Sequence, residues 1–302
     1  KNGTHPVDLY PIGALSQGMK GDNLSEMYNM KLAGAVAFSN YKNSIENAKF
    51  MQLALEYANG IDTTLIAFAQ DEKISGSAQV NEGENSTRLG LKGIPHLAEE
   101  LRVNRDIYLT KYTEGKLHFA GLSSAKSLEV IAKAKKDGLS ITCDVSATQL
   151  VLNDNCLEEF DSNYKVQPPI RIENDRKVLI NSILNGKIDV VCSDHAPQNI
   201  ENKACEFQSA SYGMIGIQTL YSLLNTKLKG EISSEVLVEK LAINPRNILG
   251  MELPEIEVGK PANLTFFDPT IEWEYNTKNN LSKSENSPFL GEKFTGKVVG
   301  VV

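Results

Sequence analysis

The feature that most constrains this fold is the repeated alternation of short apolar runs with amphipathic helical patterns. Helical patterns such as Glu46–Asn59, Ser124–Lys136 and Asp175–Leu184 carry apolar residues three and four positions apart, and several end near a glycine. Alternation of this kind predicts a parallel sheet covered by helices. The apolar runs predicted as strands are Val7–Leu15, Ala35–Phe38, Thr64–Ala69, Lys116–Leu122, Ser140–Val145 and Asp189–Asp194.

Two architectures satisfy this α/β pattern, a doubly wound sheet and a (β/α)8 TIM-type barrel. No glycine-rich nucleotide loop follows the first run, which removes the usual signature of the doubly wound sheet. About six β/α units are present, whereas a closed barrel needs eight. The first run begins at Val7, so either further barrel units lie outside this sequence or the architecture is not a barrel.

The pattern changes after Gly250. Ile256–Asp268 and Phe294–Val302 are predicted as strands, and the polar stretch Asn276–Ser287 between them as a surface loop. We therefore expect residues 1–250 to form the barrel and residues 251–302 to form a small β-sandwich part.

Composition narrows the class of protein. A net charge of −7 disfavours nucleic-acid and membrane-surface binding, because both need a basic face. No apolar run approaches the roughly 20 residues of a membrane span, and no signal peptide is visible. The four cysteines lack the spacing of a metal finger, as expected for free thiols in a reducing compartment. We expect a cytoplasmic protein.

Several segments, in the same order along nearly the whole chain, resemble the dihydroorotase family, particularly its hydantoinase-like type within the amidohydrolase superfamily. Each segment alone is modest, but the shared order is specific. The segments are Gly83–Pro95 with Ala98-Glu99, Lys165–Arg171 with Asp175-Arg176, Ser193–Pro197 with Lys203 and Phe207, Tyr212–Thr219, Gly259–Asp268 and Ser282–Gly291.

The resemblance implies a (β/α)8 metallohydrolase barrel with a small β-sandwich built from both chain ends. The family's first two barrel strands, which carry an HxH metal motif, have no counterpart in this sequence, in agreement with the count of six units. Dihydroorotases open or close a cyclic amide with a hydroxide made on bound zinc, because the metal lowers the pKa of its water to about 7. Such a site needs several imidazoles and carboxylates at the carboxyl ends of the strands.

Most positions that match the family's metal ligands carry other residues. The segment Ser39–Lys42 lacks the acid of the family's SDDG pattern, and Gln70 stands where a histidine is expected. Asp144–Leu150 lacks the tandem histidines, and Gly121–Ser124 lacks another. Amides and hydroxyls bind zinc poorly beside imidazole. We therefore predict no protein-bound metal, with zinc expected only if the absent part supplies ligands.

Asp194 is the surviving family ligand and matches the catalytic base. It can be interpreted as a vestigial catalytic acid, or as an acid that loop amides hold at a strand end. By the resemblance, Gln198 and Gln167 match substrate-binding positions, and with the backbone near Gly213 they could donate hydrogen bonds to a ligand.

The four histidines do not restore the site. His118 alternates inside a predicted strand and is expected to be a core residue, and His195 is expected to point away from Asp194. His96 follows Pro95 at a helix start, and His5 lies near the N-terminus.

Three hypotheses follow. The preferred one is a dihydroorotase homologue of the pyrimidine-biosynthesis type that has lost metal-dependent catalysis and serves as a structural or regulatory partner. By the resemblance, that partner is aspartate carbamoyltransferase. The alternative is an active dihydroorotase or cyclic-amide hydrolase, with an HxH pair in the absent part completing a zinc site around Asp194. The third is a small-molecule binding module using the emptied pocket. We expect a homo-oligomer in each case.

Overall fold

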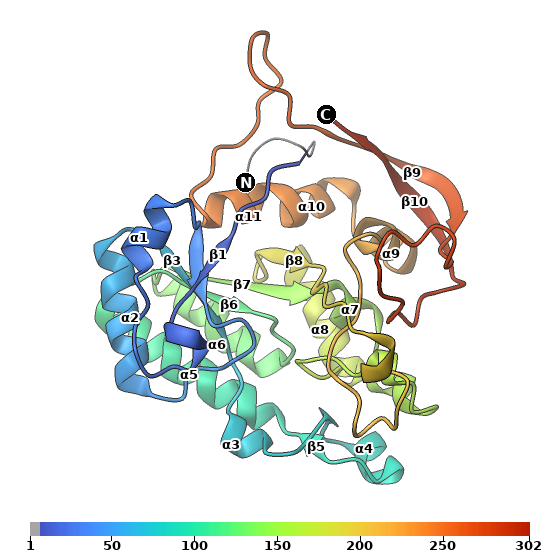
Figure 1. Ribbon diagram of the computed structural model, residues 1–302, viewed down its shortest axis with the longest axis horizontal. Coiled ribbons are helices and arrows are strands. Elements are labelled where there is room, and N and C mark those ends of the chain that lie inside the picture. The colour runs from blue at the N-terminus through green and yellow to red at the C-terminus, as the bar shows by residue number, and fades with distance from the viewer. Residues whose placement is uncertain (1–6) are drawn as a thin grey trace.

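A six-stranded parallel sheet forms the centre of the computed structural model, which describes residues 7–302 (Figure 1). Every apolar run predicted as a strand in this region contributes one strand, so that prediction is confirmed. The strands are β1 (Ile12–Ala14), β2 (Ala37–Ser39), β3 (Thr64–Phe68), β6 (Leu117–Ala120), β7 (Ile141–Ser146) and β8 (Val190–Cys192).

The order of the sheet is β1-β2-β3-β6-β7-β8, so each strand lies beside its predecessor in the chain. A doubly wound sheet reverses its order at a switch point, whereas a barrel does not. The observed order is therefore that of barrel strands. Within residues 7–302, β1 and β8 each pair on one side, and the sheet stays open between them.

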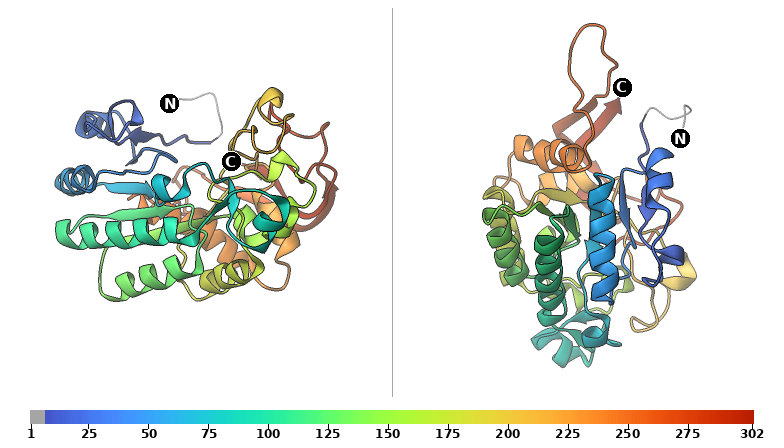
Figure 2. Two further views of the ribbon diagram at one scale, coloured as in Figure 1. Left: turned by 90° about the horizontal axis from the view of Figure 1, so that it is seen from below. Right: turned by 90° about the vertical axis from the view of Figure 1, so that its left-hand side faces the viewer.

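The main helices lie on the outer side of the sheet, and α2, α5 and α6 pack side by side there (Figure 2). The predicted helices are confirmed with small shifts at their ends. In α2, the Asn47 side chain accepts hydrogen bonds from the backbone N–H groups of Lys49 and Phe50 and caps the helix start. The helices of this layer are α1 (Met27–Leu32), α2 (Ala48–Gly60), α5 (His96–Thr113), α6 (Ala125–Lys136) and α8 (Glu173–Leu184).

Short elements follow the carboxyl ends of β3 and β7. They are α3 (Glu72–Ser75), β4 (Val80–Asn81), α4 (Glu84–Leu89), β5 (Gly93–Ile94) and α7 (Ala147–Val151). Strands β4 and β5 pair in parallel, and the first matched segment, Gly83–Pro95, contains α4 and β5. Of these elements, α3, α4 and β5 lie below the sheet in Figure 1, whereas α7 lies beside β8 and α9 (Leu220–Lys227).

The C-terminal part contains a two-stranded antiparallel sheet of β9 (Thr265–Glu274) and β10 (Lys293–Val301), reached through α9 (Leu220–Lys227), α10 (Ser234–Val238) and α11 (Asn244–Ile248). The prediction of a strand over Ile256–Asp268 was wrong for most of its length, because the ladder begins only at Thr265. The prediction of a loop over Asn276–Ser287 is confirmed. Buried Tyr275 and Phe294 join the same hydrophobic core as the parallel sheet.

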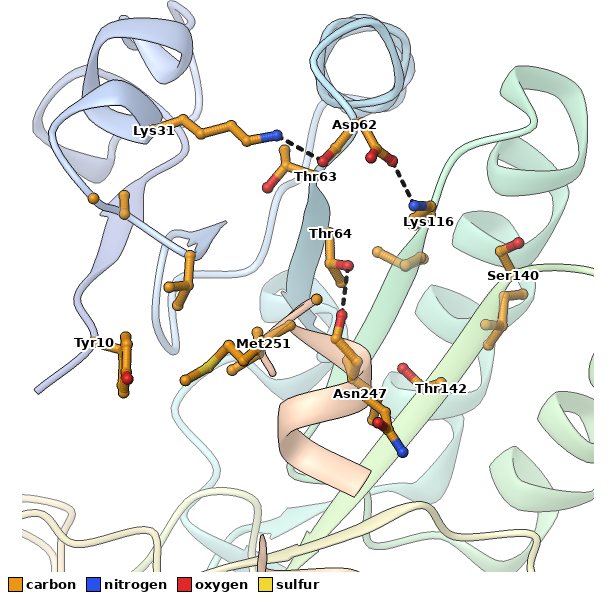
Figure 3. A pocket seen from close by; sticks show the side chains of 18 of the residues that line it. Tyr10, Lys31, Asp62, Thr63, Thr64, Lys116, Ser140, Thr142, Asn247 and Met251 are labelled. Atoms are coloured by element: carbon orange, nitrogen blue, oxygen red, sulfur yellow. Dashed lines mark hydrogen bonds and ion pairs between the residues drawn. The ribbon is translucent and has the colours of Figure 1, made fainter. Parts of the chain in front are cut away.

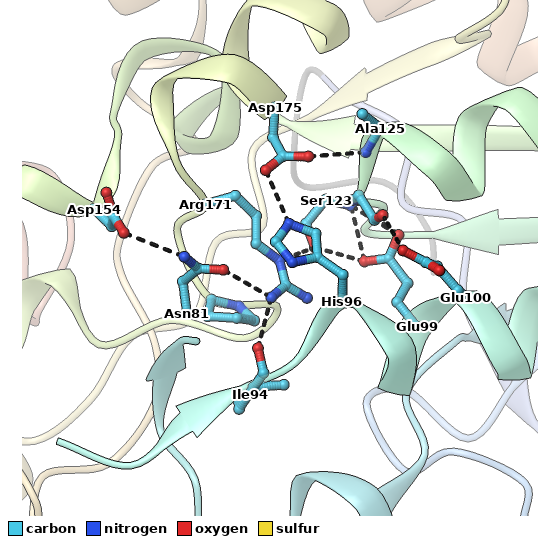
Figure 4. A network of polar contacts seen from close by, with 12 residues as sticks. Asn81, Ile94, His96, Glu99, Glu100, Ser123, Ala125, Asp154, Arg171 and Asp175 are labelled. Carbon is cyan, nitrogen blue, oxygen red and sulfur yellow. Dashed lines mark hydrogen bonds and ion pairs between the residues drawn. The ribbon is translucent and has the colours of Figure 1, made fainter. Parts of the chain in front are cut away.

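A buried polar network connects the matched segments (Figure 4). The Arg171 guanidinium donates to the Asn81 side chain at 3.0 Å, to the Ile94 carbonyl at 2.8 Å and to Ser123 Oγ at 3.0 Å. The Glu99 carboxylate accepts from the Ser123 hydroxyl at 2.5 Å and from the Ser123 N–H at 3.1 Å. The matched segments therefore meet in one hydrogen-bonded cluster, whose charged members would be costly to bury unpaired.

Among the helices of residues 7–302, none combines the length and the apolar character that a membrane crossing needs. Cys143, Cys156, Cys192 and Cys205 are all free thiols.

Candidate functional site

The carboxyl ends of the parallel strands bring Asp194 and the segments that match the family's other metal-ligand positions to one end of the sheet. Asn40 follows β2, Gln70 follows β3, Ser123 follows β6, Gln149 lies just after β7 and Asp194 follows β8. In α/β barrels this end carries the chemistry, because the loops after the strands converge there.

Asp194 forms an ion pair with Lys42, whose Nζ lies 2.8 Å from Asp194 Oδ2. Lys42 follows β2 and Asp194 follows β8, so the pair bridges strands that are not neighbours in the sheet. Both side chains are mostly buried, with 16% of Lys42 and 21% of Asp194 exposed. The expectation that loop amides hold Asp194 was wrong, because the lysine ammonium holds it instead.

The backbone and the electrostatics of Asp194 are unusual. Its φ of +46° is uncommon for a residue other than glycine and turns the chain sharply after β8. Burial raises the pKa of the Asp194 carboxyl above its ordinary value; the Lys42 ammonium opposes this shift, and nearby Asp144 adds to it. The ammonium therefore supplies the positive charge that this buried acid needs.

A second acid, Asp144 on β7, is already engaged on several sides. Its Oδ2 lies 3.0 Å from His118 Nε2, and its Oδ1 accepts from the Gly121 N–H at 2.7 Å. His118 Nδ1 lies 2.8 Å from Thr142 Oγ1, so both ring nitrogens have partners. The prediction that His118 is a satisfied core histidine is confirmed.

The amides at the expected ligand positions are bonded to the protein's own chain. Asn40 Oδ1 accepts from the Ser16 N–H at 3.0 Å, and Asn40 Nδ2 donates to Ser16 Oγ at 2.7 Å. Gln149 Nε2 donates to the carbonyls of Pro168 and Pro169 at 3.1 and 3.0 Å. Both side chains are buried, and they stabilise loops where imidazole or carboxylate would bind a metal.

The predicted ligand-binding residues are only partly available. Gln198 Nε2 donates to the Tyr212 carbonyl at 2.9 Å, although Gln198 lines a cavity of about 740 Å³ together with Lys203 and Asn286. The Gly213 N–H donates to the Lys165 carbonyl at 3.0 Å. A Cβ at Gly213 would lie 2.6 Å from the Ala196 carbonyl oxygen, so this position needs glycine.

Gln167 precedes Pro168 in a cis peptide bond and is half-buried. It lies outside the residues that line the cavity at Gln198. The structure therefore does not gather Gln167, Gln198 and Gly213 around one cavity as the sequence suggested.

The other histidines have local partners. His195 Nδ1 accepts from the Gly216 N–H at 3.1 Å, and burial lowers the pKa of His195. His96 Nε2 lies 2.9 Å from Asp175 Oδ2. His5 lies outside the described residues.

A second cavity, of about 750 Å³, lies at the opposite, amino ends of the strands (Figure 3). Lys31 and Lys116 line it, and each contacts Asp62, Lys31 at the backbone carbonyl and Lys116 at the carboxylate. The Thr64 hydroxyl donates to the Ile248 carbonyl at 3.1 Å. This cavity is separate from the Asp194 end and carries none of the predicted site residues.

The residues present do not fit a zinc site. In the part of the chain that the structure describes, no group of three or more histidine, cysteine, aspartate or glutamate side chains could hold a metal ion. A catalytic zinc needs three such protein donors besides its water, and the ammonium of Lys42 lies against Asp194, which would be one of them. No catalytic step through a metal follows from these residues.

Sequence reasoning missed Lys42 as the partner of Asp194, although a signal was present. Lys42 stands three residues beyond the end of β2, within the segment where the family's acid was expected. Parallel strands end at a common edge, so a base after β2 and an acid after β8 could have been paired.

Solved hydantoinase structures share this fold. The L-hydantoinase (dihydropyrimidinase) from Arthrobacter aurescens superimposes with a TM-score of 0.84, at 22% identity, over 98% of this chain and 69% of that one. The D-hydantoinase (dihydropyrimidinase) from Thermus sp. gives a TM-score of 0.79 at 19% identity, over 96% of this chain and 66% of that one. At these identities the likeness establishes the barrel-type fold.

Relatives found by sequence share a higher identity with this chain than these solved structures do. A family model described as dihydro-orotase-like matches residues 2–127. The dihydroorotase of Geotalea daltonii is 39% identical over 292 residues, 96% of this chain and 68% of that protein. The dihydroorotase of Acetivibrio thermocellus is 40% identical over 294 residues, 97% of this chain and 69% of that protein. With this identity over nearly its whole length, the chain belongs to the dihydroorotase family.

Proposed function

We propose that this chain is a dihydroorotase homologue of the pyrimidine-biosynthesis type that has lost metal-dependent catalysis and acts in the cytoplasm as a structural or regulatory partner of another enzyme. Aspartate carbamoyltransferase is the candidate partner, from the resemblance to degenerate dihydroorotases that assemble with it. The relatives' names support a place in pyrimidine biosynthesis, and the residues at the candidate site support the loss of metal-dependent catalysis.

The ion pair between Lys42 and Asp194 is the single observation that carries the proposal. Opening a cyclic amide at neutral pH needs a strong nucleophile and a Lewis acid, which a metal ion supplies together. An ammonium ion supplies neither, because it has no vacant coordination position. At 2.8 Å from Asp194 Oδ2, it also places a positive charge where a metal cation would have to approach.

The contrast between preserved and lost residues supports a retained role. The side chains that differ from the family pattern cluster at the carboxyl ends of the strands. The segments that resemble the family supply the buried network of Arg171, Glu99 and Asp175. A protein that keeps its fold-bearing contacts while losing its metal ligands is suited to binding a partner.

Metal analysis and turnover test the loss of catalysis. We expect the full-length protein, purified in the presence of zinc, to contain well below one zinc per chain and to leave dihydroorotate unchanged. Asp194→Ala should alter neither result. Asp189→Asn is the matched control, because Asp189 pairs with Lys135 at similar exposure but outside the site. About one zinc per chain, with turnover that Asp194→Ala abolishes and Asp189→Asn preserves, would establish the active alternative.

Co-purification tests the proposed partner. We expect aspartate carbamoyltransferase from the same cell to co-elute with the tagged protein, and its assembly to fail when the gene for this chain is deleted. A carbamoyltransferase that assembles and elutes identically with and without this chain would refute that part of the proposal, whatever the metal content.

A further inference from the structure

The cavity at the amino ends of the strands has a charged end and an apolar end (Figure 3). Lys31, Asp62 and Lys116 lie at the charged end, and Tyr10 and Met251 lie away from it. Its volume of about 750 Å³ is within the range of pockets that enclose a small organic ligand. We call it the amino-end cavity. Further apolar side chains that line it are Val36, Leu139, Ile141 and Leu249.

The charged end carries an excess of positive charge. Among the described residues that line the cavity, Lys31 and Lys116 are the cations and Asp62 is the acid. The whole protein, by contrast, has a net charge of −7. A positively charged pocket in an acidic protein concentrates anions at that point, so we expect the ligand to be an anion.

Both lysines keep N–H groups that a ligand could use. Lys31 Nζ donates to the carbonyls of Ile61 and Asp62 at 2.5 and 2.8 Å, and Lys116 Nζ donates to the Asp62 carboxylate at 2.5 Å. Each ammonium has three N–H donors, so Lys31 retains one beyond these bonds and Lys116 retains two.

Asp62 occupies the position that the anion of a ligand would take. The hydrogen bond from Lys116 lowers the pKa of the Asp62 carboxyl, which therefore stays charged at neutral pH. The Asp62 and Lys116 side chains are 82% and 49% exposed. An ion pair this exposed stabilises a protein little, so a ligand anion can displace the carboxylate from Lys116 with little loss.

Thr63, at the start of β3, adds a buried hydroxyl to the wall of the cavity. The residue is 6% exposed, and its N–H donates to the Ala58 carbonyl at 3.0 Å, which fixes its backbone. No hydrogen bond joins its hydroxyl to the other residues drawn in Figure 3. A buried hydroxyl without a partner is unfavourable, and a ligand oxygen at this end of the cavity would satisfy it.

We propose that the amino-end cavity binds a small organic phosphate whose body is a flat aromatic ring, the class to which nucleoside monophosphates belong. The phosphate bonds to Lys31, Lys116 and Thr63, and the ring lies against Tyr10 and Met251. A phosphate monoester carries nearly two negative charges at neutral pH and three acceptor oxygens, which match two ammonium groups and a hydroxyl. The tyrosine ring and the methionine thioether are both favourable surfaces for an aromatic ring.

Titration calorimetry on the full chain tests both ends of the cavity. The probes are adenosine monophosphate, uridine monophosphate, the two nucleosides and inorganic phosphate. We expect at least one nucleotide to bind about tenfold or more tightly than its nucleoside and than inorganic phosphate, because only the nucleotide engages both ends. Dissociation constants weaker than about 1 mM for both nucleotides, or a nucleoside or inorganic phosphate that binds as tightly as the nucleotide, would overturn the proposal.

Charge variants place the binding at this cavity. Lys116→Gln should weaken nucleotide binding about tenfold, and Asp62→Asn should tighten it about twofold to fivefold, because it removes the competing carboxylate. Lys227→Gln is the matched control, since Lys227 pairs with Glu292 outside the cavity at 39% exposure. Lys283→Gln tests the cavity at Gln198, which Lys283 lines.

Neither control should change the affinity, and urea unfolding confirms that each variant folds. Equal weakening by Lys283→Gln or Lys227→Gln would refute the assignment to the amino-end cavity, as would an Asp62→Asn variant that binds more weakly. Because this cavity lies at the opposite end of the sheet from Asp194, the result does not depend on whether catalysis has been lost.

Discussion

Replacing Lys42 with methionine removes the ammonium from Asp194 while keeping most of the side-chain volume. At the observed separation of 2.8 Å, the attraction between the two charges is about 6 kcal/mol for an effective dielectric constant near 20. Desolvation and side-chain ordering offset most of that attraction. The pair is about one-fifth exposed, so its net value should fall between that of a surface pair and that of a buried pair, at about 2 kcal/mol.

A double-mutant cycle measures this quantity directly. We expect Lys42→Met to destabilise the protein by about 2 to 3 kcal/mol, because it leaves a mostly buried carboxylate without its cation. Asp194→Asn should destabilise it less, and the double variant should be more stable than the sum of the single effects predicts, by about 2 kcal/mol. Urea unfolding at pH 7.5, followed by circular dichroism, gives each free energy of unfolding.

The control pairs Lys42→Met with Asp189→Asn, whose carboxylate contacts Lys135 instead. These two effects should add within about 0.5 kcal/mol, as expected for side chains without a shared partner. A coupling energy between Lys42 and Asp194 no larger than this additive background would refute the view that the ammonium is the acid's necessary partner.

Three further predictions concern the rest of the fold. Arg171→Met should lower the free energy of unfolding by about 3 to 5 kcal/mol in urea titrations, because it leaves buried acceptors and acids without their cation; a loss below 1 kcal/mol would contradict this. Gly213→Ala should cost about 1 to 3 kcal/mol, because the new methyl meets the Ala196 carbonyl, whereas Gly300→Ala has open space and serves as the control. Burial raises the pKa of Asp106 to about 6, so the folded state holds a proton between about pH 4 and 6 that the unfolded state has released. Stability should therefore fall across that window by roughly 2 to 3 kcal/mol as the pH rises, and Asp106→Asn should remove this slope, which an unchanged slope would disprove.

The strands of the sheet could be predicted from sequence because their cause is local. The run Thr64–Ala69 is apolar on both faces, as a strand buried between helices and a core must be. The run Ser140–Val145 alternates polar and apolar residues with the period of two that a strand requires. The C-terminal strand was predicted too early. Ile256 and Val258 read as strand residues, but they are fully exposed and have no ladder partner in the described chain. Apolar composition without a pairing strand does not form a sheet.

The loss of metal-binding side chains could be predicted from the sequence, but the contacts that the replacing residues make could not. The substitutions at Gln70 and Gln149 follow from comparison with the family pattern at single positions. The contact of Lys42 with Asp194 depends on two loops 152 residues apart, whose approach is set by the curvature of the sheet. The separation of Gln167 from the cavity at Gln198 is likewise a tertiary result that no local pattern encodes.

The brevity of the two outer strands of the parallel sheet has a consequence for solubility. β1 and β8 are three residues each, so an uncovered margin of the sheet offers few backbone groups to a stray extended peptide. Long, flat margins recruit foreign strands and seed fibres, whereas margins this short can template little. Within residues 7–302, β1 and β8 are thus weak templates for an added strand.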